Sequence, residues 1–164
     1  MANIAIVHEE GMLRIATFQN IQINVWSDAP DVAQMRAFSR YAQSFSHSRG
    51  KHTALLNAVI RGTPRFSEGV RDEVVKAMRL RGVFKLGAAH LITVPGFPGT
   101  ATRAFLSTAI LIGRPKTPTK VFGDPTEACE WIAERARGYE HLTATSPWDS
   151  ASLLAAYKEA LQGR

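Results

Sequence analysis

The chain has 164 residues, of which 45% are hydrophobic and 21% are charged, and its formal net charge is +6. This length suits one domain with a single core, and the composition excludes an intrinsically disordered chain. No apolar run reaches the roughly 20 residues of a membrane helix, and the N-terminus lacks the basic leader of a signal peptide, so we expect a cytoplasmic protein. The single cysteine, Cys129, excludes an internal disulfide and a cysteine-rich metal site, and we expect it in the core.

The first 26 residues predict β-structure. Residues 4–8 and 13–18 are short apolar or alternating runs separated by two glutamates and a glycine, which favours a hairpin. Residues 21–26 alternate with period two, so the odd-numbered side chains share one side of a sheet. We interpret this run as the continuation of the second strand beyond a bulge at Gln19 and Asn20.

The middle of the chain predicts a helix, a strand and a second helix. A helix-start signal at residues 27–31 precedes apolar residues at helical spacing. Residues 54–60 form a nearly continuous apolar run, as expected of a central strand covered on both sides. Pro64 then predicts a turn, and residues 68–81 predict a helix that presents its basic residues to solvent. In the first of these two helices, the apolar stripe, meaning the side chains expected to be buried together along one side, consists of Val32, Met35, Phe38, Ala42 and Phe45.

Residues 90–94 predict the next strand, which ends at the proline- and glycine-rich residues 95–99. We expect Thr100 or Thr102 to cap a third helix that buries residues such as Phe105.

The most informative stretch is residues 120–132, which predict a short strand, a tight turn and a capped helix. Asp124 is suited to accept a helix-start N–H, Pro125 fits the first helical position, and Glu127 favours the positive first turn. Beyond residue 137 the pattern changes to a linker, and Ser146 with the proline after it predicts the start of a final helix. That helix can dock on the same domain or cross to a neighbouring chain.

Strands that alternate with helices predict a layered α/β domain with a largely parallel sheet. The order of elements over residues 4–136, together with the pattern at 120–132, resembles SpoIIAA-like, STAS-related domains. The resemblance implies a mixed sheet with a helical layer over residues 1–137, and an appended linker and C-terminal helix over residues 138–164. It also implies a non-catalytic, regulatory protein-interaction module like the anti-sigma-factor antagonists.

In the family that this chain resembles, a serine or threonine at the start of the helix after the central strand is phosphorylated. Ser67 falls at the matching place, where a helix N-terminus favours a phosphate dianion. The flanking residues depart from the family pattern, because Phe66 precedes Ser67 and Glu68, which repels a phosphate, follows it. The alternative is that Ser67 is simply a helix cap.

The positive charge is concentrated between Arg61 and Lys85, where seven basic residues stand against three acidic ones. We expect this surface to favour a protein partner with an acidic surface, and nucleic acid binding stays an alternative. A solvated helix face is the simpler interpretation. The candidate partner- or anion-binding residues are Arg61, Arg65, Arg71, Thr100 and Arg103.

A further resemblance, to the related CRAL-TRIO lipid-binding domains, implies a carrier of a small apolar, lipid-like ligand. Phe97, Phe105 and Trp131 are the candidate lining residues, and core packing explains each of them equally well. The five histidines are scattered and show no metal spacing, and no nucleophile motif is present, so we expect no enzyme, metal or cofactor. A homodimer through the C-terminal helix is a further expectation, from Trp148 and Leu161.

Overall fold

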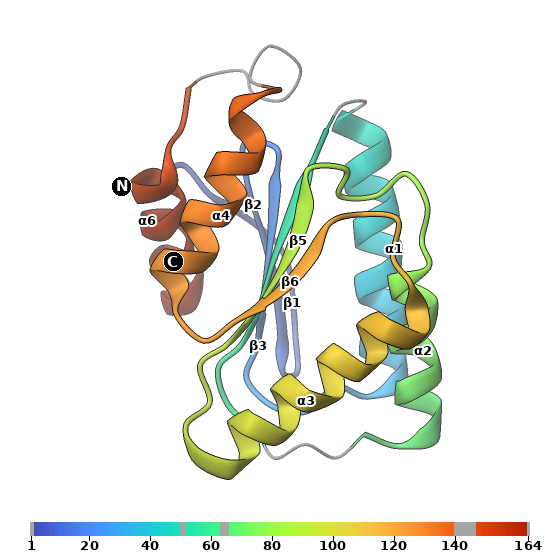
Figure 1. The fold of residues 1–164 in the computed structure, drawn as a ribbon. Helices are drawn as coiled ribbons and strands as arrows, with labels where there is room; N and C mark the ends of the chain where they lie inside the picture. The colour runs from blue at the N-terminus through green and yellow to red at the C-terminus, as the bar shows by residue number, and fades with distance from the viewer. Residues whose placement is uncertain (1, 50–51, 63–65, 140–146, 164) are drawn as a thin grey trace.

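The computed structural model describes residues 2–49, 52–62, 66–139 and 147–163. It is an α/β protein in three layers, with a central six-stranded mixed sheet covered by helices on both faces (Figure 1). The strands are β1 (Ala5–Glu10), β2 (Leu13–Phe18), β3 (Ile21–Trp26), β4 (Ala54–Val59), β5 (Gly87–Ile92) and β6 (Thr119–Phe122). The described helices are α1 (Val32–Arg49), α2 (Glu68–Met78), α3 (Gly96–Gly113), α4 (Pro125–Arg137) and α6 (Ser150–Gln162).

The strands lie in the sheet in chain order, from β1 to β6. Strands β1 to β3 pair antiparallel and strands β3 to β6 pair parallel, as expected when tight turns join the first three and helices join the others. The α/β class is therefore confirmed, with a sheet that is mixed.

The interpretation of residues 21–26 as a continuation of the second strand is wrong. Strand β3 turns back and pairs antiparallel with β2 along its whole length, from Leu13 opposite Trp26 to Phe18 opposite Ile21. The reversal takes place at Gln19 and Asn20, where Gln19 adopts a φ of 53°. A positive φ suits the tight turn of a hairpin and is unusual for glutamine, so residue type alone does not mark Gln19 as a turn residue.

Helices α4 and α6 cover one face of the sheet. Their inward side chains, such as Ile132 and Leu153, pack on apolar strand residues such as Leu56 and Leu91 in one continuous buried cluster. Cys129 lies in this cluster as a free, buried thiol, as the sequence predicts, and burial raises its pKa to about 12.

Helices α1, α2 and α3 cover the opposite face (Figure 1). The stripe of α1 is buried at Met35, Phe38, Ala42 and Phe45, together with alternate side chains of β2, β4 and β5 such as Leu55. Because successive strand residues point to opposite faces, the period-two pattern of each strand divides its side chains between these two cores.

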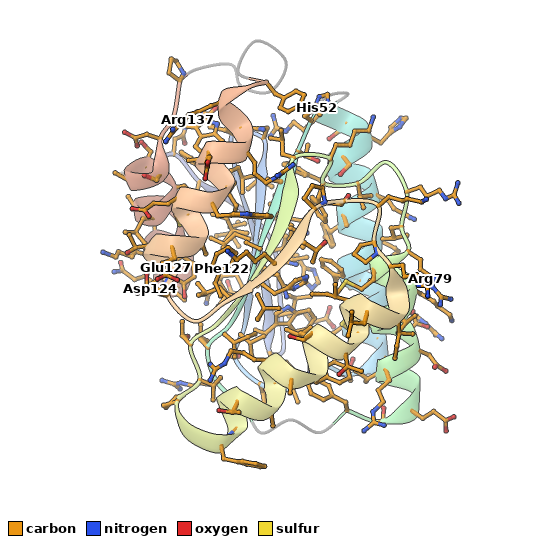
Figure 2. All side chains as sticks on the ribbon, viewed as in Figure 1. His52, Arg79, Phe122, Asp124, Glu127 and Arg137 are labelled. Atoms are coloured by element: carbon orange, nitrogen blue, oxygen red, sulfur yellow. The ribbon has the colours of Figure 1, made fainter. Side chains whose placement is uncertain are left out.

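Side chains cap α2 and α4 as the sequence predicts. The Ser67 hydroxyl accepts a hydrogen bond from the Val70 N–H, with a distance of 3.2 Å between Oγ and N. The Asp124 carboxylate accepts one from the Glu127 N–H at 3.0 Å, and Pro125 occupies the first turn. Figure 2 shows Asp124 and Glu127 together at the start of α4.

The prediction that Thr100 or Thr102 caps α3 is wrong. Helix α3 begins at Gly96, and its N-cap residue, Pro95, makes no side-chain cap hydrogen bond. Both threonines lie inside the helix and donate to carbonyls four residues earlier. Pro98 is tolerated in the first turn because N–H groups there have no partner within the helix, so the proline- and glycine-rich segment starts the helix instead of preceding it.

Helix α6 packs on α4 and on strands β2 and β3, so the alternative in which it docks on the same domain is confirmed. Its N-cap is Asp149, and the predicted start at Ser146 lies outside the described residues. Trp148 and Leu161 are half-buried against the α4/α6 core, and the Trp148 indole donates to Asn20 at 3.1 Å. The two side chains thus contact their own chain.

Candidate functional site

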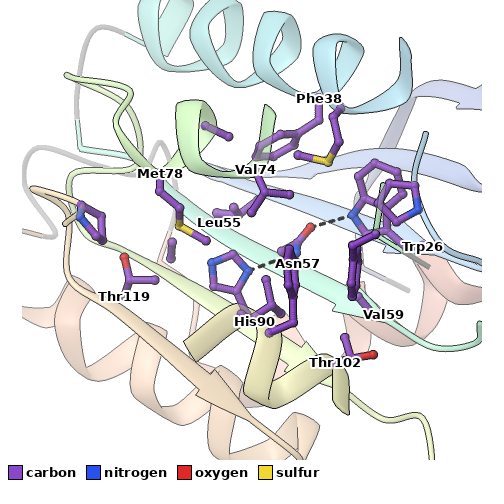
Figure 3. Close-up of a pocket in the computed structure, with 18 of the residues that line it drawn as sticks. Trp26, Phe38, Leu55, Asn57, Val59, Val74, Met78, His90, Thr102 and Thr119 are labelled. Atoms are coloured by element: carbon purple, nitrogen blue, oxygen red, sulfur yellow. Dashed lines mark hydrogen bonds between the residues drawn. The ribbon is translucent and has the colours of Figure 1, made fainter. Parts of the chain in front are cut away.

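A cavity of about 100 Å³ lies between the sheet and helices α1, α2 and α3 (Figure 3). Its floor is formed by strand residues including Trp26, Leu55, Asn57 and His90. The helices contribute the opposite wall, which is almost entirely apolar: Met35, Phe38, Val74, Ala77, Met78, Phe105 and Leu106. Arg61, at the edge of the cavity, is the one charged residue among the described lining residues, and its side chain is exposed.

A row of polar side chains crosses the floor. Asn24, Asn57 and His90 occupy paired register positions on the neighbouring strands β3, β4 and β5, so they lie side by side on the face that α1, α2 and α3 cover. The cluster that buries this face is made of apolar residues such as Leu55, Trp26 and Ala88. Parallel strands in register bring these residues together although they are far apart in the sequence.

The polar row is joined by hydrogen bonds (Figure 3). The Trp26 indole N–H donates to Asn57 Oδ1 at 2.8 Å, and Asn57 Nδ2 lies 3.1 Å from His90 Nδ1. Asn24 Nδ2 also approaches Asn57 Oδ1, at 3.5 Å, and Gln22 Nε2 donates to Asn24 Oδ1 at 3.0 Å.

His90 ends this row with one nitrogen unused. Its side chain is 5% exposed, and within the described part of the chain its Nε2 atom has no hydrogen-bond partner. Burial lowers the pKa of His90 to about 4, so the imidazole is neutral at pH 7. His90 is therefore neither a surface residue nor, among the described residues, a fully hydrogen-bonded one.

An aromatic pair closes one side of the cavity. Phe66, just before α2, stacks on Phe105 of α3 with ring centroids 3.8 Å apart and 10° between the ring planes. Because Ser67 follows Phe66 directly, the start of α2 is linked by one peptide bond to the wall of the cavity.

Of the predicted apolar-ligand residues, the structure places only Phe105 at this cavity. Phe97 is 81% exposed in the first turn of α3. Trp131 lies on α4, on the opposite face of the sheet, where it covers Gly87 and packs on Phe122 with ring centroids 5.6 Å apart. The three side chains therefore do not line one cavity, because α3 and α4 cover different faces.

The predicted partner- or anion-binding residues are only partly brought together. Arg103 Nη2 donates to the Thr100 hydroxyl at 3.3 Å, and Nη1 lies 3.5 Å from the Ile92 carbonyl oxygen. Strands β4 and β5, which lead to these segments, are neighbours in the sheet. Arg61 and Arg71 are exposed, and Arg65 lies outside the described residues.

Asn57 and His90 were missed as site residues by sequence reasoning. The available signal was a polar residue at an inward position of a strand otherwise built from apolar residues. Across the described residues, no group of three histidine, cysteine or acidic side chains is placed to hold a metal ion.

Comparisons of the chain with protein-family models, curated proteins and solved structures find no match. None of the described helices has the length and apolar character needed to cross a membrane.

Proposed function

We propose that this protein binds a small, mostly apolar molecule in the cavity between the sheet and helices α1, α2 and α3. The observation that carries the proposal is the cavity itself, whose walls are almost entirely apolar and whose volume is about 100 Å³. An engineered apolar cavity of about 150 Å³ in another protein stays dry and takes up benzene or xenon. A cavity of this size suits a body of about five or six non-hydrogen atoms.

The energetics of packing support a ligand. Protein interiors are close-packed, and an empty cavity costs about 24 cal/mol per Å³. The cavity therefore costs this fold about 2 kcal/mol when nothing occupies it. A bound apolar molecule would restore the missing contacts and offset that cost.

The proposal is tested by filling the cavity from within. Ala77 on α2 lines the cavity and is half-buried, so Ala77→Leu places extra side-chain volume inside it. Benzene should raise the melting temperature of the unmodified protein, since a ligand that binds only the folded state stabilises it, and should leave the variant unchanged. The proposal is wrong if benzene has no effect on either protein, or an equal effect on both.

A second candidate function is the regulatory protein-interaction module of the SpoIIAA-like, STAS-related kind that the element order resembles. The observation that favours it is the exposed Ser67 at the N-terminus of α2, with the exposed Arg71 one turn later. A phosphate on Ser67 would meet free N–H groups and a nearby guanidinium. Under this candidate function, the protein is cytoplasmic and its partner is a protein with an acidic surface. Two other partners are alternatives: a second copy of the chain, bound through the C-terminal helix, and a nucleic acid.

Charge reversal tests this second candidate. Arg71→Glu should weaken capture of an acidic partner, whereas Arg137→Glu should not, because Arg137 is an exposed residue at the end of α4 on the other side of the molecule (Figure 2). If the two variants weaken binding equally, the acidic partner does not bind specifically at the surface around Arg71. Binding to a nucleic acid that falls steeply with salt would instead support the nucleic acid alternative.

A further inference from the structure

The hydrogen bonds of the polar row fix the orientation of Asn57. The indole of Trp26 has an N–H group and no acceptor, so it can only donate. The atom of the Asn57 amide that it meets at 2.8 Å must therefore be the oxygen, and the Asn24 amide also directs a donor to that oxygen. The amide nitrogen of Asn57, which can only donate, is then the atom that faces His90.

The orientation of Asn57 in turn fixes the tautomer of His90. Because Asn57 Nδ2 donates across the 3.1 Å separation, His90 Nδ1 must accept and carries no proton. A neutral imidazole then holds its single proton on Nε2. The hydrogen bonds of the polar row thus make His90 Nε2, the ring nitrogen away from Asn57, an N–H donor.

This donor is buried and lacks a partner among the described residues. Figure 3 shows the second ring nitrogen on the side of His90 away from Asn57, towards Met78 and Thr119. Thr102, Thr117 and Thr119 each donate their hydroxyl hydrogen to a backbone carbonyl, and none of their oxygens accepts a hydrogen bond from His90 Nε2. A buried donor without a partner lowers the stability of the folded protein. A ligand whose acceptor atom receives the His90 Nε2–H would remove that cost and would bind more tightly for it.

We infer that the ligand of this cavity is a neutral molecule with an apolar body and one hydrogen-bond acceptor, such as a carbonyl, ether or ring nitrogen, which receives the His90 Nε2–H. This inference rests on the proposed function and adds the chemical class of the ligand. The apolar lining takes the body of the molecule, and His90 Nε2–H, the one unpaired buried donor among the described lining residues, selects the acceptor. An anion is disfavoured because the one cation of the described lining, Arg61, is exposed at the edge.

Benzene and pyridine form a matched pair of probes, because they have nearly the same shape and only pyridine carries an acceptor. Their dissociation constants are measured by NMR titration at pH 8, where pyridine is neutral. For each protein, the ratio of pyridine affinity to benzene affinity is calculated. This ratio is then compared between the unmodified protein and a variant. The difference in hydration between the two probes is the same for both proteins, so it cancels in the comparison.

The variant His90→Asn removes the Nε2–H donor and keeps an acceptor for Asn57. The asparagine oxygen can take the place of His90 Nδ1 and still accept from Asn57, but the shorter side chain has nothing at the position of Nε2. We expect the affinity ratio to fall about tenfold in this variant. The matched control is His47→Asn on the exposed end of α1, which should leave the ratio unchanged.

The tautomer is tested in the unmodified protein, so the inference does not depend on whether a variant folds. Nitrogen-15 NMR of the His90 ring should show the proton on Nε2 at pH 8, and this proton should shift when pyridine is added but much less with benzene. A proton on Nδ1, or an affinity ratio that His90→Asn does not change while both probes still bind, overturns the inference alone. Failure of both probes to bind overturns the proposed function with it.

Discussion

Leu55 and Leu56 are neighbours on strand β4, and both are almost fully buried, yet they belong to two differently built cores. Leu56 faces α4 and α6, in a cluster made almost entirely of apolar side chains. Leu55 faces α1, α2 and α3, where it borders the cavity and the polar row of Asn57 and His90. One sheet therefore carries a closely packed face and a face with an unfilled space.

The difference shows which face serves stability and which can serve function. A cavity and a buried unpaired donor both cost stability, and both occur on the α1/α2/α3 face. No described residue of the α4/α6 face lines this cavity, and that face buries large side chains such as Ile132 and Leu153 at 0–1% exposure. We interpret the α4/α6 face as the part that holds the fold together.

The largest expected effect is the contrast between two leucine truncations. Leu56→Ala should lower the free energy of unfolding by about 3 to 4 kcal/mol, because it leaves a new cavity in a packed core. Leu55→Ala should cost about 2 kcal/mol, because Leu55 already borders a space and loses fewer contacts. Urea denaturation measures both, and an equal or larger loss for Leu55→Ala would contradict the comparison.

The second effect is a dependence of stability on pH that comes from His90. Its pKa is lowered by burial from the ordinary value of about 6.5 to about 4, so between these values the unfolded chain binds a proton that the folded protein does not. Stability from this group is thus fully present above pH 6.5 and is lost as the pH falls, by about 1 kcal/mol per pH unit and about 3 kcal/mol in all. Urea denaturation at several pH values should show that the free energy of unfolding depends less steeply on pH in His90→Asn than in the unmodified protein. Identical slopes for the two proteins would show that His90 is not the source of the pH dependence.

The third effect is the opposite response of the two faces to added volume. Ala128 on α4 is fully buried in the packed cluster, so Ala128→Leu should destabilise the fold by about 2 kcal/mol. Ala77→Leu extends into the cavity and should change the free energy of unfolding by less than about 1 kcal/mol, or raise it. Thermal denaturation compares the pair, and similar losses for both would mean that the cavity has no free space.

The smallest effect should be the same on both faces. Ser67→Ala and Asp124→Ala each remove a side-chain cap from a helix N-terminus, and each should cost about 1 kcal/mol. Equal losses in urea denaturation would show that the faces differ in packing and not in how their helices begin. No loss for Ser67→Ala would contradict the cap and leave Ser67 without a structural role.

Local signals in the sequence predicted much of the fold. Asp124 and Pro125 marked the start of α4, Ser67 marked the start of α2, and period-two alternation assigned the sides of β3. Errors arose where a residue adopts a conformation that its type disfavours, as at the Gln19 turn, or where a proline stands inside a first helical turn, as at Pro98.

The site itself was harder to predict because it depends on contacts between distant segments. Asn57 and His90 are 33 residues apart and meet only through the parallel register of β4 and β5. The candidate residue Trp131 was assigned to a cavity because it is aromatic, whereas its position depends on which face of the sheet α4 covers. Hydrophobic periodicity in the sequence predicts that a side chain is buried, but it does not predict which other buried side chains it contacts.

Xenon binding followed by carbon-13 NMR of the methyl groups would show which part of the core holds free apolar space, because xenon enters apolar cavities without needing a specific contact. We expect shifts for the methyl groups of Leu55, Val74 and Met78, which line the cavity, and none for Leu56, Leu91 and Ile132 on the α4/α6 face. Shifts on both faces, or on neither, would mean that the cavity beneath α1, α2 and α3 is not a distinct site for an apolar ligand.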